Sequence, residues 1–180
     1  MNIFTFPNAL TFARIIIIPF FVISLLYKKN HYALILFVVA AITDLFDGFL
    51  ARLTNQKTKL GAFLDPLADK FLLITSFILL AFYGWLPIWV TITVISRDII
   101  VIVGWCILVI FLHERKVEPS LAGKLANAFQ AILIAYILFL INFDIDNPLI
   151  RHSILFFTVF FTALSGIQYI YRGYKQFHES

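Results

Sequence analysis

Stretches of about 20 largely apolar residues follow one another along almost the whole chain. A helix of that length spans the hydrocarbon layer of a bilayer, because each residue adds about 1.5 Å along the helix axis. Of all residues, 62% are hydrophobic and 13% are charged, and the mean hydropathy is +0.95. These values lie far outside the range of a soluble domain. The sequence therefore predicts an all-α integral membrane protein.

Six transmembrane helices fit this pattern when polar residues are allowed at their ends. We expect them at residues 10–27, 33–53, 60–82, 87–112, 121–141 and 150–171. The connections are short and polar, and no repeat or low-complexity segment indicates a second domain. Residues 1–180 are therefore predicted to form a single membrane domain, with the first apolar stretch retained as a helix rather than removed as a signal peptide.

The distribution of lysine and arginine predicts how the chain is oriented. With both termini in the cytoplasm, the outer connections hold only Lys28, Lys29 and Arg151, which Asp144 and Asp146 partly offset. The cytoplasmic side then holds the larger basic set: Arg52, Lys57, Lys59, Arg115, Lys116, Lys124, Arg172 and Lys175. The positive-inside rule favours this orientation. It also accounts for the net charge of +4 without a nucleic-acid partner.

Two interpretations stay open for the amino terminus. Residues 6–11 are apolar but carry amide and hydroxyl groups. They are expected either to lie along the membrane interface as a short amphipathic segment or simply to begin the first helix. In the second interpretation the side chain of Arg14 extends to the interface.

Four aspartates interrupt the apolar pattern on either side of the connection between the second and third spans. In the second span, Asp44 and Asp47 share one helical face, which Gly48, Ala51 and Arg52 continue. Both carboxylates therefore point in one direction. The small side chains leave the backbone of that face open to a ligand, and the arginine adds a fixed cation.

The third span repeats this arrangement with wider spacing. Gly61, Asp65 and Asp69 lie four positions apart along one face, and Pro66 is expected to kink the helix. Because the connection is short, an antiparallel helix pair brings all four carboxylates to one pocket near the cytoplasmic surface. Their mutual repulsion requires divalent cations, and oxygen ligands select hard ions. We expect two Mg²⁺ ions, with Mn²⁺ as a substitute, and phosphoryl transfer as the chemistry.

Paired acids inside a membrane also form proton relays and cation pathways, so a metal-ion transporter is an alternative. The residues beside the acids argue against it. A helix face with Gly48, Ala51 and Arg52 suits a bulky anionic ligand better than a bare ion, although small residues also serve helix packing.

The two aspartate faces together form a motif of fixed spacing, Asp44-x2-Asp47-Gly48-x2-Ala51-Arg52-x8-Gly61-x3-Asp65-x3-Asp69. This motif resembles the signature of the CDP-alcohol phosphotransferase family, with all eight fixed positions filled. The resemblance implies a six-helix membrane enzyme, usually a homodimer. Such enzymes transfer a phosphatidyl group from a CDP-linked lipid to an alcohol and release CMP. The orientation given by the lysine and arginine distribution places such an active site at the cytoplasmic surface, and the membrane is expected to be the cytoplasmic membrane.

Carried over position by position, the resemblance implies that Asp44, Asp47 and Asp65 hold the metal ions. Asp69 is then both a metal ligand and the general base that deprotonates the acceptor hydroxyl. The implied contacts to CDP-diacylglycerol are Pro7, Asn8, Ala9, Leu10, Gly48, Ala51, Arg52, Thr58 and Gly61.

Two groups within this family share further segments with the chain. Residues 8–14 and 64–70 are similar to the phosphatidylglycerophosphate synthases, whose acceptor is glycerol 3-phosphate. They also resemble the cardiolipin synthases of this superfamily, whose acceptor is phosphatidylglycerol. Asp98 after Arg97 and the aromatic residues 169–174 are closer to the second group. The main prediction is a phosphatidylglycerophosphate synthase, with cardiolipin synthase as the alternative.

The charge of the acceptor predicts which residues bind it. Glycerol 3-phosphate carries a dianionic phosphate and needs cations in its pocket. Arg97 in the fourth span and Lys124 at the start of the fifth are the candidates. The competing interpretation is an internal ion pair between Arg97 and Asp98 and an interfacial Lys124.

Overall fold

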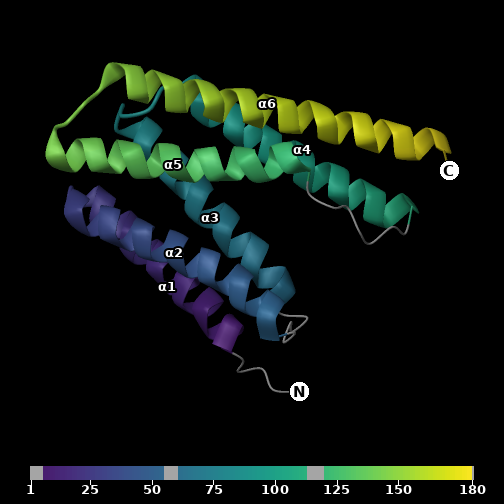
Figure 1. Cartoon of the computed structure of the whole chain (residues 1–180), viewed down its shortest axis with the longest axis horizontal. Helices are drawn as coiled ribbons and strands as arrows, with labels where there is room; N and C mark the ends of the chain where they lie inside the picture. Colours follow the sequence, from purple (N-terminus) through teal and green to yellow (C-terminus); the bar gives the residue numbers. More distant parts are fainter. Residues whose placement is uncertain (1–5, 55–60, 113–119, 180) are drawn as a thin grey trace. The chain divides into compact units, whose positions relative to one another are not determined.

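The computed structural model describes residues 6–54, 61–112 and 120–179, with side chains for 13–43, 70–104 and 120–172. Within these ranges the chain forms six helices and no strand (Figure 1). They are α1 (Phe6–Leu26), α2 (Asn30–Thr54), α3 (Gly61–Phe82), α4 (Ile88–Leu112), α5 (Leu121–Phe143) and α6 (Pro148–Glu179). The prediction of an all-α chain is confirmed.

Each predicted span corresponds to one helix, and the largest differences are at the two ends of the chain. α1 begins at Phe6 instead of residue 10, and α6 continues to Glu179 instead of ending at 171. The prediction counted the apolar length needed to cross hydrocarbon, whereas a helix can continue into polar surroundings. Because α1 is continuous from Phe6, residues 6–11 begin the first helix and are not a separate segment.

The expectation that the side chain of Arg14 extends to the membrane interface is wrong. It lies in α1 and is only 1% exposed, so it is among the largest fully buried side chains of the described residues. An arginine that reaches an interface keeps its head group in water, which this burial rules out.

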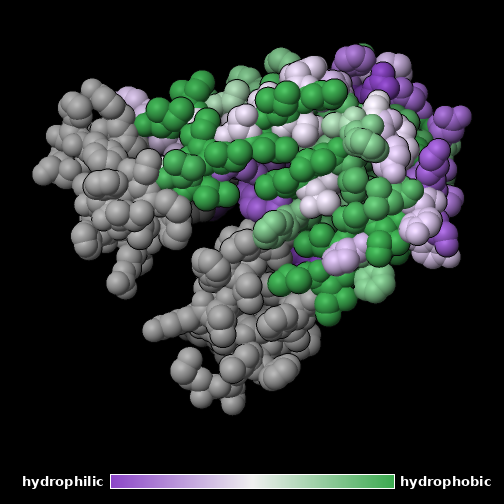
Figure 2. Space-filling view, turned by 180° about the vertical axis from the view of Figure 1, so that it is seen from behind, coloured by the Kyte–Doolittle hydropathy of each residue, from purple (hydrophilic) through white to green (hydrophobic). Residues whose placement is uncertain are grey.

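Two helices in the described part of the chain are long and apolar enough to cross a membrane, Leu121–Phe143 and Pro148–Arg172. The other apolar stretches found there are shorter: 13–26, 30–43 and 70–82. Large apolar side chains such as Ile16, Phe20 and Phe82 are exposed, and Figure 2 shows extensive apolar surface on one face. Exposed apolar surface of this extent suits contact with lipid. These features indicate a membrane protein.

The chain divides into two compact units. The first comprises Met1–Leu80 and Ile134–Ile145, and the second comprises Ala81–Leu133 and Asp146–Ser180. In the first unit α1 and α2 run antiparallel side by side (Figure 1). Phe21 of α1 packs against Phe37 of α2 with ring centroids 6.0 Å apart. Ala33 and Ala40 of α2 are also buried, and their small side chains allow close helix packing.

In the second unit α4 packs on α6, and the first half of α5 lines the same interior. Phe129 of α5 stacks on Phe157 and Phe161 of α6, with ring centroids 5.5 and 5.2 Å apart. Polar side chains are also buried here, among them Arg97, Asp98, Gln130, Thr158, Thr162 and Ser165. Buried polar groups require hydrogen-bond partners, so this interior determines which helix faces can meet.

Candidate active site

The structure places the four motif aspartates on two consecutive helices of the first unit. Asp44 and Asp47 lie in the last turns of α2, and Asp65 and Asp69 lie in the first turns of α3. A helical backbone puts residues three or four positions apart on one face, as the sequence predicts. The side chains of all four lie outside the described residues, so the meeting of four carboxylates stays a prediction.

All but one of the predicted CDP-lipid contacts fall on α1, α2 and α3. Pro7 to Leu10 are in the first turns of α1, the glycine, alanine and arginine of the motif are in α2, and Gly61 is the first residue of α3. Their side chains are not among those described. Thr58 lies outside the described residues altogether.

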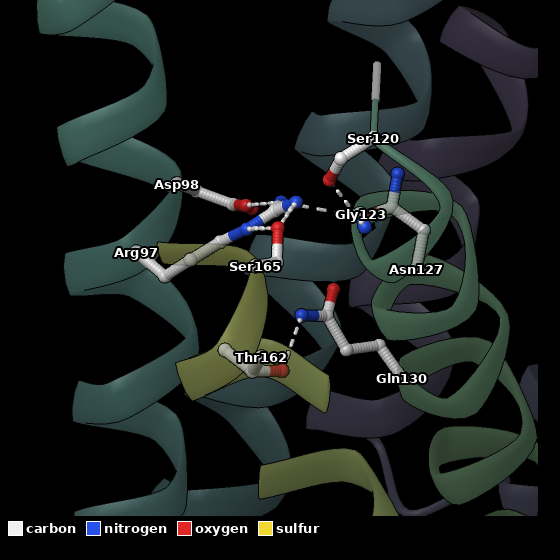
Figure 3. A network of polar contacts seen from close by, with 8 residues as sticks. All are labelled: Arg97, Asp98, Ser120, Gly123, Asn127, Gln130, Thr162 and Ser165. Carbon is white, nitrogen blue, oxygen red and sulfur yellow. Dashed lines mark hydrogen bonds and ion pairs between the residues drawn. The ribbon is translucent and has the colours of Figure 1, made fainter. Parts of the chain in front are cut away.

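The best described polar cluster surrounds Arg97, which is 8% exposed in the second unit (Figure 3). Its Nη1 donates to Asp98 Oδ1 over 2.7 Å and makes a longer contact of 3.4 Å to Asn127 Oδ1. Its Nε and Nη2 both donate to the hydroxyl oxygen of Ser165, over 3.2 and 2.7 Å. Among the described residues, these bonds use four of the five guanidinium N–H groups.

The start of α5 closes one side of this cluster. Ser120 precedes the helix and accepts a hydrogen bond from the backbone N–H of Gly123 over 3.1 Å, which is a side-chain cap of the first turn. A Cβ on Gly123 would lie 3.1 Å from Arg97 Nη2 and 3.3 Å from Ser165 Oγ. The absence of a side chain at this glycine therefore allows α5 to approach the guanidinium closely.

A second polar contact continues the cluster between α5 and α6. Gln130 Nε2 donates to Thr162 Oγ1 over 3.2 Å, and both side chains are fully buried (Figure 3). One turn further, Thr158 Oγ1 donates to the backbone carbonyls of Phe129 and Ile154. The buried hydroxyls of α6 thus follow one helical face, at positions 158, 162 and 165.

The two predicted acceptor cations differ in environment. Lys124 is exposed and is not part of the cluster in Figure 3, whereas Arg97 is buried and paired with Asp98. The internal ion pair is thus present. A role for either cation in acceptor binding stays a prediction.

Sequence reasoning missed Ser165, Thr162, Gly123 and Ser120. Hydroxyl residues at helical spacing within an apolar stretch were the available signal for the first two.

A family model described as CDP-alcohol phosphatidyltransferase matches residues 4–164. The chain belongs to the CDP-alcohol phosphatidyltransferase family. Its motif helices, Arg97 and Lys124 all lie within the matched range. The family assignment suggested by the aspartate motif is therefore confirmed.

Similarity to named relatives covers almost the whole chain. It is 35% identical over 175 residues to the CDP-diacylglycerol–glycerol-3-phosphate 3-phosphatidyltransferase of Escherichia coli, covering 93% of each chain. A Shigella flexneri protein of the same name gives the same values. A probable phosphatidylglycerophosphate synthase of Mycobacterium tuberculosis is 33% identical over 177 residues, covering 93% of this chain and 81% of the relative.

Proposed function

We propose that the chain transfers the phosphatidyl group of CDP-diacylglycerol to glycerol 3-phosphate, giving phosphatidylglycerophosphate and CMP. The observation that carries this proposal is the match to relatives bearing the corresponding enzyme names over 93% of the chain. The complete aspartate motif on α2 and α3 supports the shared half of the reaction, in which the CDP-lipid is bound and cleaved.

In this reaction Asp69 takes the proton from the acceptor's primary hydroxyl. The hydroxyl oxygen then forms a bond to the β-phosphorus of the CDP-lipid, the pyrophosphate P–O bond breaks, and CMP leaves. The all-oxygen donor set of Asp44, Asp47, Asp65 and Asp69 fits two Mg²⁺ ions, with Mn²⁺ as a substitute. When bound, such ions stabilise negative charge on the pyrophosphate.

The remaining motif positions are proposed to hold the donor lipid. Arg52 supplies a cation for the pyrophosphate, and the absence of bulky side chains at Gly48 and Ala51 lets the nucleotide approach the helix backbone. We assign Pro7 to Leu10, Thr58 and Gly61 to the same ligand on the family resemblance.

For the acceptor we propose Arg97 as the phosphate ligand and Lys124 as a second cation. Arg97 keeps one Nη2 N–H beyond its contacts to the described residues, which suits one more acceptor oxygen. Because Asp98 already offsets its charge, Arg97 supplies orientation more than net positive potential. Lys124, which is exposed, then contributes the uncompensated charge that a dianionic phosphate needs.

The membrane arrangement belongs to the same proposal. All six helices cross the cytoplasmic membrane, both termini are cytoplasmic, and the α2–α3 connection faces the cytoplasm, where CDP-linked and phosphorylated substrates are available. The excess of lysine and arginine on that side supports this orientation. A homodimer is expected by resemblance to the family.

The deciding experiment measures CMP release by purified protein with CDP-diacylglycerol and Mg²⁺, comparing glycerol 3-phosphate with phosphatidylglycerol as the acceptor. Release that depends on glycerol 3-phosphate supports the proposal. Release only with phosphatidylglycerol would make the enzyme a cardiolipin synthase, the alternative that Asp98 favours. Ion uptake into proteoliposomes with no CMP release would instead indicate a transporter.

A further inference from the structure

A polar pocket lies where the turn between α1 and α2 meets the end of α5, within the first unit. Its volume is about 400 Å³, and its lining includes Lys28, Lys29, Asn30, His31 and Asn142. This volume falls in the range of sites for small organic ligands and is larger than a single ion requires. None of the described residues that line it is acidic. The pocket therefore suits an anionic group of several atoms.

The turn fixes the two lysines at consecutive positions. Lys28 N–H donates to Leu25 O over 3.0 Å, and Lys29 N–H donates to Ser24 O over 2.8 Å, which together form a Schellman motif at the end of α1. Lys28 has a φ of 55°, a left-handed conformation in which glycine is usual. The backbone would accept glycine here more easily, but glycine would remove one of the two cations beside the pocket.

Two asparagines hold the wall of the pocket in place. Asn142 Nδ2 donates to the backbone carbonyls of Asn30 and Leu138, over 3.1 and 2.7 Å, which fixes the orientation of its amide. The Oδ1 atoms of Asn142 and Asn30 are buried, so a ligand in the pocket does not reach them. These contacts join the start of α2 to the end of α5, and the two lysines are the charged groups that remain accessible in the lining.

The surroundings of the pocket favour a lipid over a free phosphate. Leu26, Tyr27, Ile35 and Phe143 are all exposed next to its lining residues. Exposed tyrosines beside lysines and aliphatic residues are typical of the depth at which phospholipid headgroups lie. Acyl chains can run along the aliphatic side chains while the headgroup occupies the pocket.

We propose that this pocket binds the headgroup of an anionic phospholipid. The two lysines hold the phosphate diester, and the exposed aliphatic side chains beside the pocket contact the acyl chains. The site is separate from the aspartate motif, because Asn30 and Asp44 lie on the same helix with an axial separation of about 21 Å at 1.5 Å per residue. The proposal thus does not depend on the proposed reaction.

The test measures lipid binding, not turnover. The full-length protein in mild detergent and EDTA is offered phosphatidylglycerol, phosphatidylmethanol and phosphatidylcholine in equal amounts, and the lipids that remain bound are counted by native mass spectrometry. The test variant is Lys28→Gly/Lys29→Gln, which preserves the left-handed turn. The matched control is Arg151→Gln, which removes a half-exposed cation that pairs with Asp146 and does not line the pocket.

Wild-type protein and the Arg151→Gln control are expected to retain the two anionic lipids, phosphatidylglycerol and phosphatidylmethanol, over phosphatidylcholine. The lysine variant is expected to lose about 25-fold in affinity, because each of the two lysines near an anionic headgroup contributes roughly fivefold. Equal retention by the lysine variant overturns the proposal, and so does equal retention of phosphatidylcholine. Displacement of the lipid by millimolar inorganic phosphate would identify a site for free phosphate instead.

Discussion

At the scale of single residues, Arg97 has an unusual set of partners. Its ion pair is with Asp98, the next residue in the chain. Side chains of consecutive residues point in different directions around a helix, so the arginine side chain has to bend around the helix to reach this carboxylate. Ser165 receives two of its N–H groups and Asn127 lies near a third. The direction of the guanidinium is thus set from α6 and α5 as well as from its own helix.

Substitution of Ser165 tests whether this direction matters. Ser165→Ala removes two hydrogen bonds to a charged group, each contributing about 1.5–3 kcal/mol. We expect the KM for glycerol 3-phosphate to rise about tenfold, with little change in the KM for CDP-diacylglycerol. Thr158→Val, which also removes a buried hydroxyl of α6, is the control and should leave both constants unchanged. An equal rise in both constants for Ser165→Ala would show a structural role only.

Two glycines close to Arg97 make a matched pair for a second test. In Gly123→Ala the new Cβ lies 3.1 Å from Arg97 Nη2, so the guanidinium has to shift. In Gly166→Ala the nearest arginine atom is Cγ at 3.6 Å, an ordinary contact. We expect Gly123→Ala to weaken acceptor binding about tenfold in steady-state kinetics, at a cost of about 1.4 kcal/mol. Gly166→Ala should behave as wild type, and similar losses in the two variants would contradict this account.

The most direct prediction about the chemistry concerns Asp69. Asp69→Asn removes the base, so the turnover number should fall at least about 100-fold in the CMP-release assay. Binding of CDP-diacylglycerol, followed by equilibrium dialysis with Mg²⁺, should stay measurable because three of the four aspartates remain. Asp144→Asn, which changes an exposed aspartate outside the motif, serves as the control. Full activity of Asp69→Asn would refute the assignment of the base.

At the scale of helices, the end of α5 resembles the end of α1. Asp144 has a φ of 52° and donates its N–H to Leu140 O over 2.8 Å, which closes the last turn. Asp144→Gly should raise the free energy of unfolding by about 1 kcal/mol, because glycine adopts this conformation without steric cost. The measurement is the unfolding midpoint in detergent. Asp146→Gly is the control, since it removes the 3.0 Å ion pair with Arg151 and should not stabilise.

Helices were the part of the fold that the sequence predicted best. Their lengths follow from apolar stretches of membrane thickness, which is a local property. The burial of Arg14 was not predictable in this way, because it depends on which helices surround α1. The same holds for Ser165 and Gly123, whose importance comes from contacts with Arg97 across the second unit. The motif aspartates were identified because their spacing along the chain is itself the signal.

At the scale of the whole molecule, the proposed orientation can be tested by labelling single cysteines in a Cys106→Ala background. A cysteine at Tyr27, which directly follows α1, and one at Asn147, in the predicted outer connection before the last span, should react with a membrane-impermeant maleimide in intact cells. A cysteine at Lys57, in the predicted cytoplasmic connection, should react only after permeabilisation. The reverse pattern would invert the topology, and labelling of all three in intact cells would exclude the six-span arrangement.

The contact between Arg97 and Ser165 joins residues 68 positions apart, and the serine lies on the last helix. A ribosome therefore completes α4 long before the acceptor of two guanidinium N–H groups has been synthesised. Asp98 is made immediately after the arginine, so in the proposed six-span arrangement the nascent α4 enters the bilayer with its charge already paired, which lowers the cost of insertion. The two hydrogen bonds to Ser165 have to wait for α6. Maturation of this cluster is thus tied to completion of the polypeptide, and a chain cut short after α5 would leave α4 with an incompletely bonded buried cation.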